Sequence, residues 1–254
     1  MAEPTPTTAT SASRSEKLGV VVPLANEEDV VEEFLRRVLA HLAPQDSVFC
    51  VLDNVSRDST RGKIEAFAER DPRVVLVWAP ENRCVVDAYF RGYRAALAAG
   101  CDWILEMDGG MSHLPEEIPL FLAAMAQGAE FAAGSRFIEG GSHTGRLSRR
   151  WLSKGGTVLA NLVLGTRMRD MTSGFECFAR EALEQVVAKG VRSKAHFFQT
   201  EIRFMLRHRR WVEIPITYSA PSSTVGKDKV LEALRNLWRL RREARAERRR
   251  GSPA

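Results

Sequence analysis

The chain has 254 residues, of which 44% are hydrophobic and 27% are charged. This composition is typical of a globular protein with room for one large domain. The net charge of +5 is concentrated near the C-terminus, because residues 235–250 hold eight arginines and two glutamates and the rest of the chain is close to neutral. A nearly neutral body argues against nucleic acid as a partner, and the basic end predicts contact with an anionic surface.

Cysteine usage and hydropathy constrain the cellular setting. The four cysteines lie apart, without a CxxC pair or the spacing of a zinc site, so we expect free thiols in a reducing cytoplasm. The N-terminus lacks the apolar stretch of a secretory signal, and no apolar run is long enough to cross a bilayer. Any membrane contact is therefore expected to be peripheral, at the inner face of the membrane.

The first half of the chain alternates short apolar runs with amphipathic segments. Residues 1–16 are rich in Thr, Ser, Ala and Pro and predict a disordered tail. Helical patterns then separate the apolar runs, which predict strands at 18–22, 48–52, 74–78, 104–107 and 131–134. This alternation favours an α/β fold with a mostly parallel sheet flanked by helices. No GxGxxG follows the first strand, so the dinucleotide-binding fingerprint is absent.

The second half is less regular. A flexible loop at 140–145 precedes a helix at 147–164 that is apolar on much of its surface. The further expected elements are a strand at 176–179, helices at 180–189 and 198–207, an edge strand at 212–218 and a basic helix from 229 to about 249. The sequence thus predicts three parts, namely the tail, one domain at 17–228, and a basic helix and tail at 229–254.

One strand ends on an unusual turn. The apolar run from Trp103 to Met107 stops at Asp108, and two glycines follow it. Ligands of open α/β sheets bind beyond the carboxyl ends of the strands, so Asp108 is a candidate site residue. The alternative is a turn aspartate followed by turn glycines.

Eight short motifs resemble, in their order and spacing, the family 2 glycosyltransferases with the GT-A fold, in particular the dolichyl- and polyprenyl-phosphate sugar synthases. Segment 20–27 is similar to their opening strand and Asn-Glu turn, and segment 107–115 to their Asp-Ala-Asp-Leu-(Ser/Gln)-His-x-Pro motif. The other six are at 52–60, 134–136, 171–175, 198–201, 212–215 and 226–229. The resemblance covers roughly residues 17–235.

This resemblance implies a Rossmann-like GT-A domain that binds a nucleoside-diphosphate sugar and transfers the sugar, with inversion, to a polyprenyl phosphate. The apolar helix at 147–164 would then form the acceptor side, and the basic C-terminal helix would touch anionic lipid headgroups. Two alternatives stay open. One is a soluble hydroxyl acceptor in natural-product or glycan biosynthesis, and the other is a nucleotide-sugar-binding protein without turnover.

The resemblance also assigns the donor site. Asp53, at the end of the second strand, would accept hydrogen bonds from the base, and Lys229 would lie near the donor diphosphate. Helix-terminal charge complementarity is the alternative for Glu27, and turn chemistry is the alternative for Asp53. The implied nucleotide-sugar-binding residues are Pro23, Ala25, Glu27, Asp53, Asp108, Gly109 and Lys229.

A divalent metal is implied at the same turn. Asp108 would bind the Mg²⁺ or Mn²⁺ that neutralises the diphosphate, and Ser112 stands where some relatives have a metal-binding glutamine. The second aspartate of the family motif falls on Gly110, which has no side chain. Metal binding is then either looser, completed by water and phosphate, or dispensed with. His113, in the same turn, could be recruited to the metal, although a turn histidine before Leu-Pro is more often a surface residue.

Arg136 and Glu201 complete the predicted catalytic set with Asp108. Arg136 resembles the arginine that meets the acceptor phosphate, which is already anionic and needs little deprotonation. Glu201 matches a helical Gln-x-Glu motif and either acts as a base or holds a basic neighbour in place.

Overall fold

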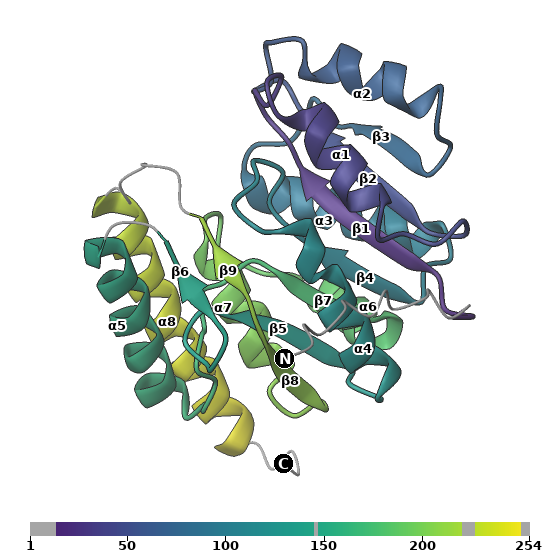
Figure 1. Ribbon diagram of the computed structural model, residues 1–254. Helices are drawn as coiled ribbons and strands as arrows, with labels where there is room; N and C mark the ends of the chain where they lie inside the picture. Colours follow the sequence, from purple (N-terminus) through teal and green to yellow (C-terminus); the bar gives the residue numbers. More distant parts are fainter. Residues whose placement is uncertain (1–13, 145–146, 220–226, 250–254) are drawn as a thin grey trace, which may run out of the picture.

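The computed structural model describes residues 14–144, 147–219 and 227–249 (Figure 1). Its centre is a seven-stranded sheet with the order β3-β2-β1-β4-β7-β5-β8, in which β7 alone runs antiparallel to its neighbours. The predicted mostly parallel sheet is confirmed. The strands are β1 (Leu18–Pro23), β2 (Ser47–Leu52), β3 (Val74–Trp78), β4 (Trp103–Glu106), β5 (Phe131–Ser135), β7 (Glu176–Ala179) and β8 (Trp211–Pro215).

Helices cover both faces of the sheet, because its strands are apolar on both sides. Alternate residues of β1 enter different cores, with Val20 and Val22 in one and Val21 in the other. The first core is covered by α1 (Val31–Leu39), α2 (Thr60–Ala68) and, after the 3-10 turn η1 (Pro115–Glu117), α4 (Ile118–Ala126). The second is covered by α3 (Val85–Ala98), α6 (Arg180–Lys189) and α7 (Phe197–Met205).

Two long helices, α5 (Leu147–Leu164) and α8 (Lys227–Arg249), lie side by side at one side of the molecule (Figure 1). Leu237 and Leu240 of α8 are buried in the second core, and Arg239 pairs with Glu201 of α7 at 2.9 Å. The basic helix is therefore packed onto the domain through its middle turns. The tail expected at 1–16 is described only from Arg14 onward.

A second, two-stranded sheet lies next to α5 and α8. It consists of β6 (Ser142–His143) and β9 (Thr217–Tyr218). Two expectations need correction here: the loop at 140–145 contains β6, and the single edge strand at 212–218 is divided into β8 and β9. The division falls at Ile216, whose N–H donates to the last residue of β5 while its carbonyl accepts from Ser142 of β6. The chain thus passes from one sheet to the other at this residue.

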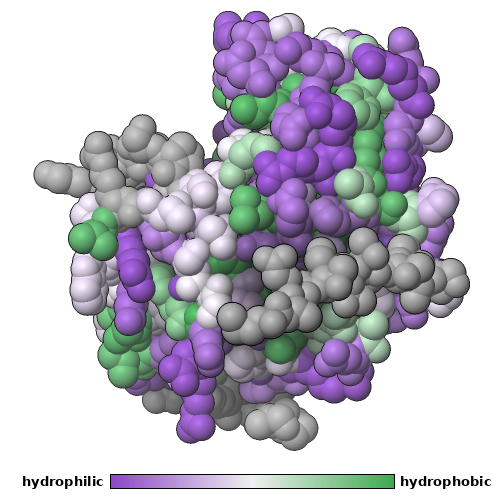
Figure 2. Space-filling view, viewed as in Figure 1, coloured by the Kyte–Doolittle hydropathy of each residue, from purple (hydrophilic) through white to green (hydrophobic). Residues whose placement is uncertain are grey.

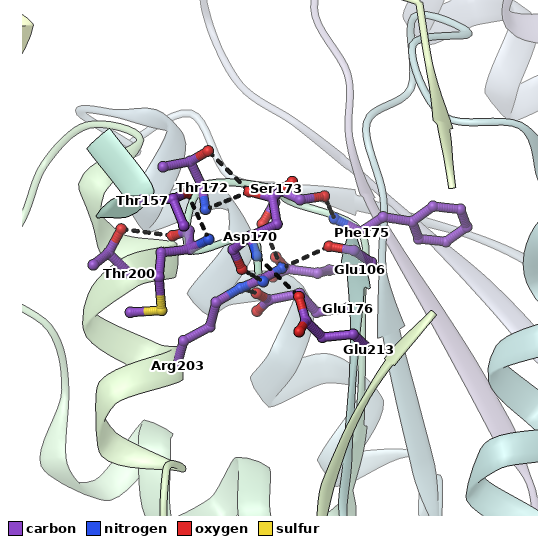
Figure 3. A network of polar contacts seen from close by, with 12 residues as sticks. Glu106, Thr157, Asp170, Thr172, Ser173, Phe175, Glu176, Thr200, Arg203 and Glu213 are labelled. Carbon is purple, nitrogen blue, oxygen red and sulfur yellow. Dashed lines mark hydrogen bonds and ion pairs between the residues drawn. The ribbon is translucent and has the colours of Figure 1, made fainter. Parts of the chain in front are cut away.

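A buried arginine joins α7 to the sheet (Figure 3). Arg203 is fully buried, and its Nε donates to Oε1 of Glu176 on β7 at 2.5 Å. Its Nη1 donates to the carbonyl of Asp170, and its Nη2 donates to the carbonyls of Gly134 and Ser173 at 3.2 and 3.1 Å. A buried cation is stable only when it is paired and hydrogen-bonded, and this guanidinium meets both conditions.

Two buried carboxyls share this single cation. Glu106 of β4 lies opposite Glu176 in the strand register, and it accepts a hydrogen bond from the hydroxyl of Tyr93. Glu106 Oε1 and Glu176 Oε2 are buried without a hydrogen-bond partner in the described part of the chain. Burial, followed by the charge of Glu176, raises the pKa of Glu106 well above its ordinary value. Burial also raises the pKa of Glu176, to about 7, although Arg203 opposes the shift.

Replacing Arg203 should therefore cost much of the stability of the fold. We expect Arg203→Met to lower the free energy of unfolding by about 3–5 kcal/mol, because Glu176 and three carbonyls lose their partner. Adding Glu176→Gln should recover part of the loss, since the uncompensated charge disappears. Urea unfolding measures both effects, with Arg36→Met as the surface control, for which we expect less than about 1 kcal/mol. Equal losses for Arg203→Met and Arg36→Met would contradict the argument.

The buried carboxyls also predict a pH dependence. A carboxyl with a raised pKa binds more protons in the folded chain than in the unfolded chain. Its contribution to stability is complete below the ordinary value of 4.5 and is lost as the pH rises through the folded value. Glu106→Gln, which cannot ionise, should therefore gain stability relative to the natural chain between about pH 5 and about pH 8. Urea midpoints at both pH values test this, and a parallel pH response of the two proteins would refute it.

Candidate functional site

The turns after β1 and β2 are joined into one rim. The two strands are parallel neighbours that end side by side, with Pro23 paired to Val51. Asn26, in the left-handed region at φ 58°, donates from its side chain to the carbonyl of Val55 and accepts from the N–H of Arg57, at 3.2 and 2.9 Å. Asparagine tolerates this backbone conformation well. The rim is thus fixed by its own hydrogen bonds, and Ala25 is exposed on it.

The acidic residues of this rim differ in how their carboxylate oxygens are hydrogen-bonded. Asp53 Oδ1 accepts from the N–H of Val55 at 2.9 Å, so one of its oxygens closes a turn. Both oxygens of Asp58 accept backbone N–H groups, from Glu28 and from Thr60, at 3.1 and 3.0 Å. Asp58 therefore has the turn and capping role that its position suggests.

Asp108 stands at the carboxyl end of β4 and is held from two sides. The hydroxyl of Tyr89 donates to Asp108 Oδ1 at 2.9 Å, and the N–H of Asp108 donates to Nδ1 of His113 at 3.1 Å. The Asp108 side chain is 41% exposed, so a ligand can reach it. The expectation that His113 lies at the surface is wrong, because its ring is 1% exposed and stacks on Phe175. Burial also lowers the pKa of His113, which favours the neutral ring that accepts this hydrogen bond.

The two glycines let the Asp108 turn approach the first rim closely. A Cβ on Gly109 would lie 2.2 Å from Leu24 Cδ2, so only glycine fits without movement of Leu24. A Cβ on Gly110 would lie 2.8 Å from Oε1 of Glu27. The Asp108 turn and the β1 turn are therefore in contact, and the sequence-predicted residues Pro23, Ala25, Glu27, Asp108 and Gly109 lie along this contact or next to it.

The residues present suit a metal that is shared with a ligand. Among the described residues, no group of three or more His, Cys, Asp or Glu side chains is arranged to hold a metal ion. Mg²⁺ in proteins commonly takes one or two carboxylates and fills its other positions with phosphate and water. Asp108 supplies such an oxygen. Ser112 is less available, because it is 6% exposed and its side chain hydrogen-bonds with Tyr218.

A cavity of about 500 Å³ opens beside Asp108 and continues between α5 and α8. It brings together three sequence-predicted residues, Asp108, Arg136 and Lys229. The polar end near Asp108 is lined by Thr172, Gln199 and Tyr218 as well as these residues, and the apolar part by Leu152, Leu159, Ala160, Leu234 and Leu237. The cavity therefore has a charged end at the sheet edge and an apolar end between two helices.

Arg136 is fixed at the charged end. Its Nε and Nη2 donate to the carboxylate of Asp170 at 2.7 and 2.9 Å, and Nη2 also reaches the hydroxyl of Thr172 at 2.6 Å. Burial disfavours the charged form of Asp170, but the adjacent Arg136 outweighs it and lowers the pKa of Asp170 to about 2. The ring of Tyr218 lies 5.3 Å from the Arg136 guanidinium carbon. Nε and Nη2 are thus engaged, and Nη1 makes no hydrogen bond within the described residues, although the Arg136 side chain is only 4% exposed.

Glu201 is not brought to this cavity. It is 4% exposed, accepts from the N–H groups of Arg192 and Ser193, and pairs with Arg239. Of the two interpretations offered for Glu201, the geometry matches the structural one, in which the carboxylate holds a basic neighbour.

Several site residues were not identified from the sequence. Tyr89 lies on the buried face of α3, where a tyrosine resembles any other core aromatic. Asp170 directly precedes the motif at 171–175 and was detectable as part of it. Tyr218 reaches the site only because the chain leaves β8 for the second sheet.

Known proteins resemble this chain over most of its length. A family model described as Glycosyl transferase family 2 matches residues 19–187. Polyprenol monophosphomannose synthase from Mycolicibacterium smegmatis is 32% identical over 212 residues, or 82% of this chain and 79% of that protein. Undecaprenyl-phosphate mannosyltransferase from Micrococcus luteus is 30% identical over 201 residues, or 78% of this chain and 82% of that protein.

Solved structures agree on the architecture. Glucosyl-3-phosphoglycerate synthase from Mycobacterium tuberculosis in complex with uridine diphosphate superposes with a TM-score of 0.66 at 14% identity, covering 89% of this chain and 80% of that one. The same enzyme with Mn²⁺, uridine diphosphate and phosphoglyceric acid gives a TM-score of 0.62 at 16% identity, with coverage of 94% and 80%. At this identity the likeness establishes the fold. Together these findings show that the chain belongs to glycosyl transferase family 2 and is a glycosyltransferase with the GT-A fold.

Proposed function

We propose that this glycosyltransferase moves a sugar from a nucleoside-diphosphate sugar to a polyprenyl phosphate, with inversion at the sugar carbon. The observation that carries the proposal is the cavity that joins a charged end at Asp108 and Arg136 to an apolar groove between α5 and α8. A phosphate on a long hydrocarbon chain is an acceptor that fits both ends. The relatives named as polyprenol and undecaprenyl-phosphate mannosyltransferases support the same acceptor class.

The donor would bind across the rim formed by the β1 and β2 turns. In open α/β sheets this edge receives nucleotides, and it carries Pro23, Ala25, Glu27 and Asp53. The diphosphate would extend from the rim toward Asp108 and Gly109. Lys229, at the cavity and on an exposed helix position, would approach it with a positive charge that stabilises the leaving group.

The acceptor phosphate would be held by Arg136. One edge of this guanidinium is occupied by Asp170 and Thr172, so the remaining nitrogen, Nη1, is offered in a fixed direction. A phosphate monoester already has an anionic oxygen that can attack the sugar carbon, so a general base is not required. Asp108 and Arg136 both line the cavity, which allows donor and acceptor to meet there for an in-line displacement.

A divalent ion would assist the donor side. When bound, Mg²⁺ or Mn²⁺ would neutralise charge on the departing nucleoside diphosphate. Structures of the GT-A fold with Mn²⁺ and uridine diphosphate support divalent metal use in this fold. In this chain Asp108 would be the principal protein ligand, with Ser112 a weaker candidate because of its burial.

The exposed surfaces of α5 and α8, including the rim of the cavity at Trp151, suit a peripheral membrane contact. Among the described residues, no helix is long and apolar enough to cross a bilayer. Trp151 and Leu162 of α5 are nevertheless 69% and 74% exposed, and Trp238 of α8 is 52% exposed. In Figure 2, hydrophobic and hydrophilic residues are interspersed on this side of the molecule. Exposed tryptophans beside arginines are the composition of an interfacial helix, which would bring the groove to a lipid acceptor.

Activity assays test the proposed reaction. The protein is incubated with UDP- and GDP-sugars, Mn²⁺ and a polyprenyl phosphate, and labelled sugar is measured in the organic phase. We expect transfer, and we expect Asp108→Asn to lower kcat by roughly 10²–10³-fold because the donor charge loses its partner. Asp102→Asn, before the opposite end of β4, is the matched control and should stay near the natural rate.

Three outcomes would contradict the proposal. If Asp108→Asn kept the activity of the natural protein, the assignment of the donor site to this turn would be wrong. Transfer confined to soluble hydroxyl acceptors would support the alternative acceptor class. Nucleotide binding without turnover on any acceptor would support a non-catalytic protein.

The membrane contact has its own test. Sedimentation with vesicles that contain anionic phospholipid should recover the natural protein, and Trp151→Ala with Trp238→Ala should reduce the bound fraction severalfold, because both rings lose interfacial burial. Trp78→Ala is the matched control, since Trp78 is also exposed but lies on β3 and stacks on Arg61. An equal bound fraction for the double variant and the control would contradict a contact through α5 and α8.

A further inference from the structure

Gly110 leaves a space that another residue of this chain fills. A Cβ at position 110 would lie 2.8 Å from Glu27 Oε1 and 3.3 Å from both Cδ and Oε2 of the same side chain. The Glu27 carboxylate therefore occupies the volume into which a side chain at 110 would project. An aspartate at 110 and Glu27 in its present position would be in direct conflict.

Glu27 is fixed through its backbone, and its carboxylate is not engaged. Its N–H donates to Thr60 Oγ1 at 2.8 Å, and its carbonyl accepts from the N–H groups of Val30 and Val31. Within the described residues, neither carboxylate oxygen accepts a hydrogen bond or pairs with a cation. A partly buried carboxylate without a positive partner is stabilised when a cation binds to it.

Other negative groups surround the Glu27 carboxylate. Position 110, which the Glu27 carboxylate adjoins, is two residues from Asp108 in the same turn, so Glu27 and Asp108 belong to adjoining turns. A cation bound where these turns meet would offset the charge of both carboxylates. Asp58 is a poor ligand for such a cation, because both of its oxygens already accept backbone N–H groups.

We propose that Glu27 supplies the second carboxylate of the divalent metal site, in place of the side chain that Gly110 lacks. Asp108 supplies the first, and diphosphate oxygens complete the coordination. Two carboxylates with phosphate are a common ligand set for Mg²⁺, and this set agrees with the lack of a ready-made protein cage in the described residues. The inference rests on the proposed nucleoside-diphosphate donor.

This arrangement predicts that metal and nucleotide bind cooperatively. Each supplies ligands or charge that the other needs, and the coupling is reciprocal in binding free energy. A Glu27 that only contacts the ribose would contribute equally with and without metal. The metal dependence of nucleotide affinity therefore separates the two roles.

Calorimetric titration of the full chain with GDP and with UDP, in EDTA and in Mn²⁺, makes this measurement. We expect Mn²⁺ to tighten binding of the preferred nucleotide to the natural protein by roughly 5- to 150-fold. In Glu27→Gln most of that gain should disappear, so that the ratio of the affinities in Mn²⁺ and in EDTA falls toward one whatever affinity in EDTA the variant keeps, because the amide has the shape of the side chain but not its charge. Glu28→Gln is the matched control and should retain the gain.

The double variant Glu27→Ala with Gly110→Asp provides the rescue, because the alanine vacates the space that the Glu27 carboxylate fills. The new aspartate returns a carboxylate to the same space, so the Mn²⁺ gain and the loss of the free Mn²⁺ signal in electron paramagnetic resonance should reappear. An undiminished Mn²⁺ gain in Glu27→Gln would overturn the proposal, and so would equal losses in EDTA and in Mn²⁺. Failure of the natural protein to bind either nucleotide under both conditions would instead contradict the proposed donor.

Discussion

The buried guanidinium of Arg203 is the interaction on which the site depends. It draws together Glu176 of β7 and the carbonyls of Gly134, Asp170 and Ser173. Those carbonyls belong to the end of β5 and to the loop before β7, which are the segments that carry Arg136 and the polar rim of the cavity. Because a buried cation must keep its partners, the backbone of both segments is fixed from within the core.

Asp170 connects Arg203 to the cavity. The backbone of Asp170 is held from behind by Arg203, and its carboxylate holds Arg136 by two charge-assisted hydrogen bonds. On the side proposed for the donor, hydrogen bonds of Asn26 fix the rim independently of this network. Asp108 stands between the two halves, tied to Tyr89 and His113. Each half of the site is therefore rigid for a separate physical reason.

The sequence predicted those features that depend on local pattern and missed those that depend on long-range pairing. The parallel strands were predictable, because burial on both faces produces continuous apolar runs. The direction of β7 was not, since four residues with Glu176 among them carry no signal for antiparallel pairing. Glu201 was selected as a site residue and Arg203 was not. Both are buried on α7. The burial of Arg203 is explained only by its pairing with Glu176, which lies far away in sequence.

Gly110 shows how one missing side chain is compatible with a charged site. A second aspartate there would crowd Glu27 and would add one more carboxylate where Glu27 and the Asp108 turn already meet. In the proposed metal site, the charge of one divalent ion would have to offset the diphosphate as well as the protein ligands, so each extra carboxylate would add repulsion that the ion does not fully cancel. With Gly110 the turn can approach Glu27 while the number of free carboxylates stays at two. The glycine and the glutamate are thus parts of one arrangement, and the departure from the family motif at position 110 is meaningful only together with the side chain that fills its space.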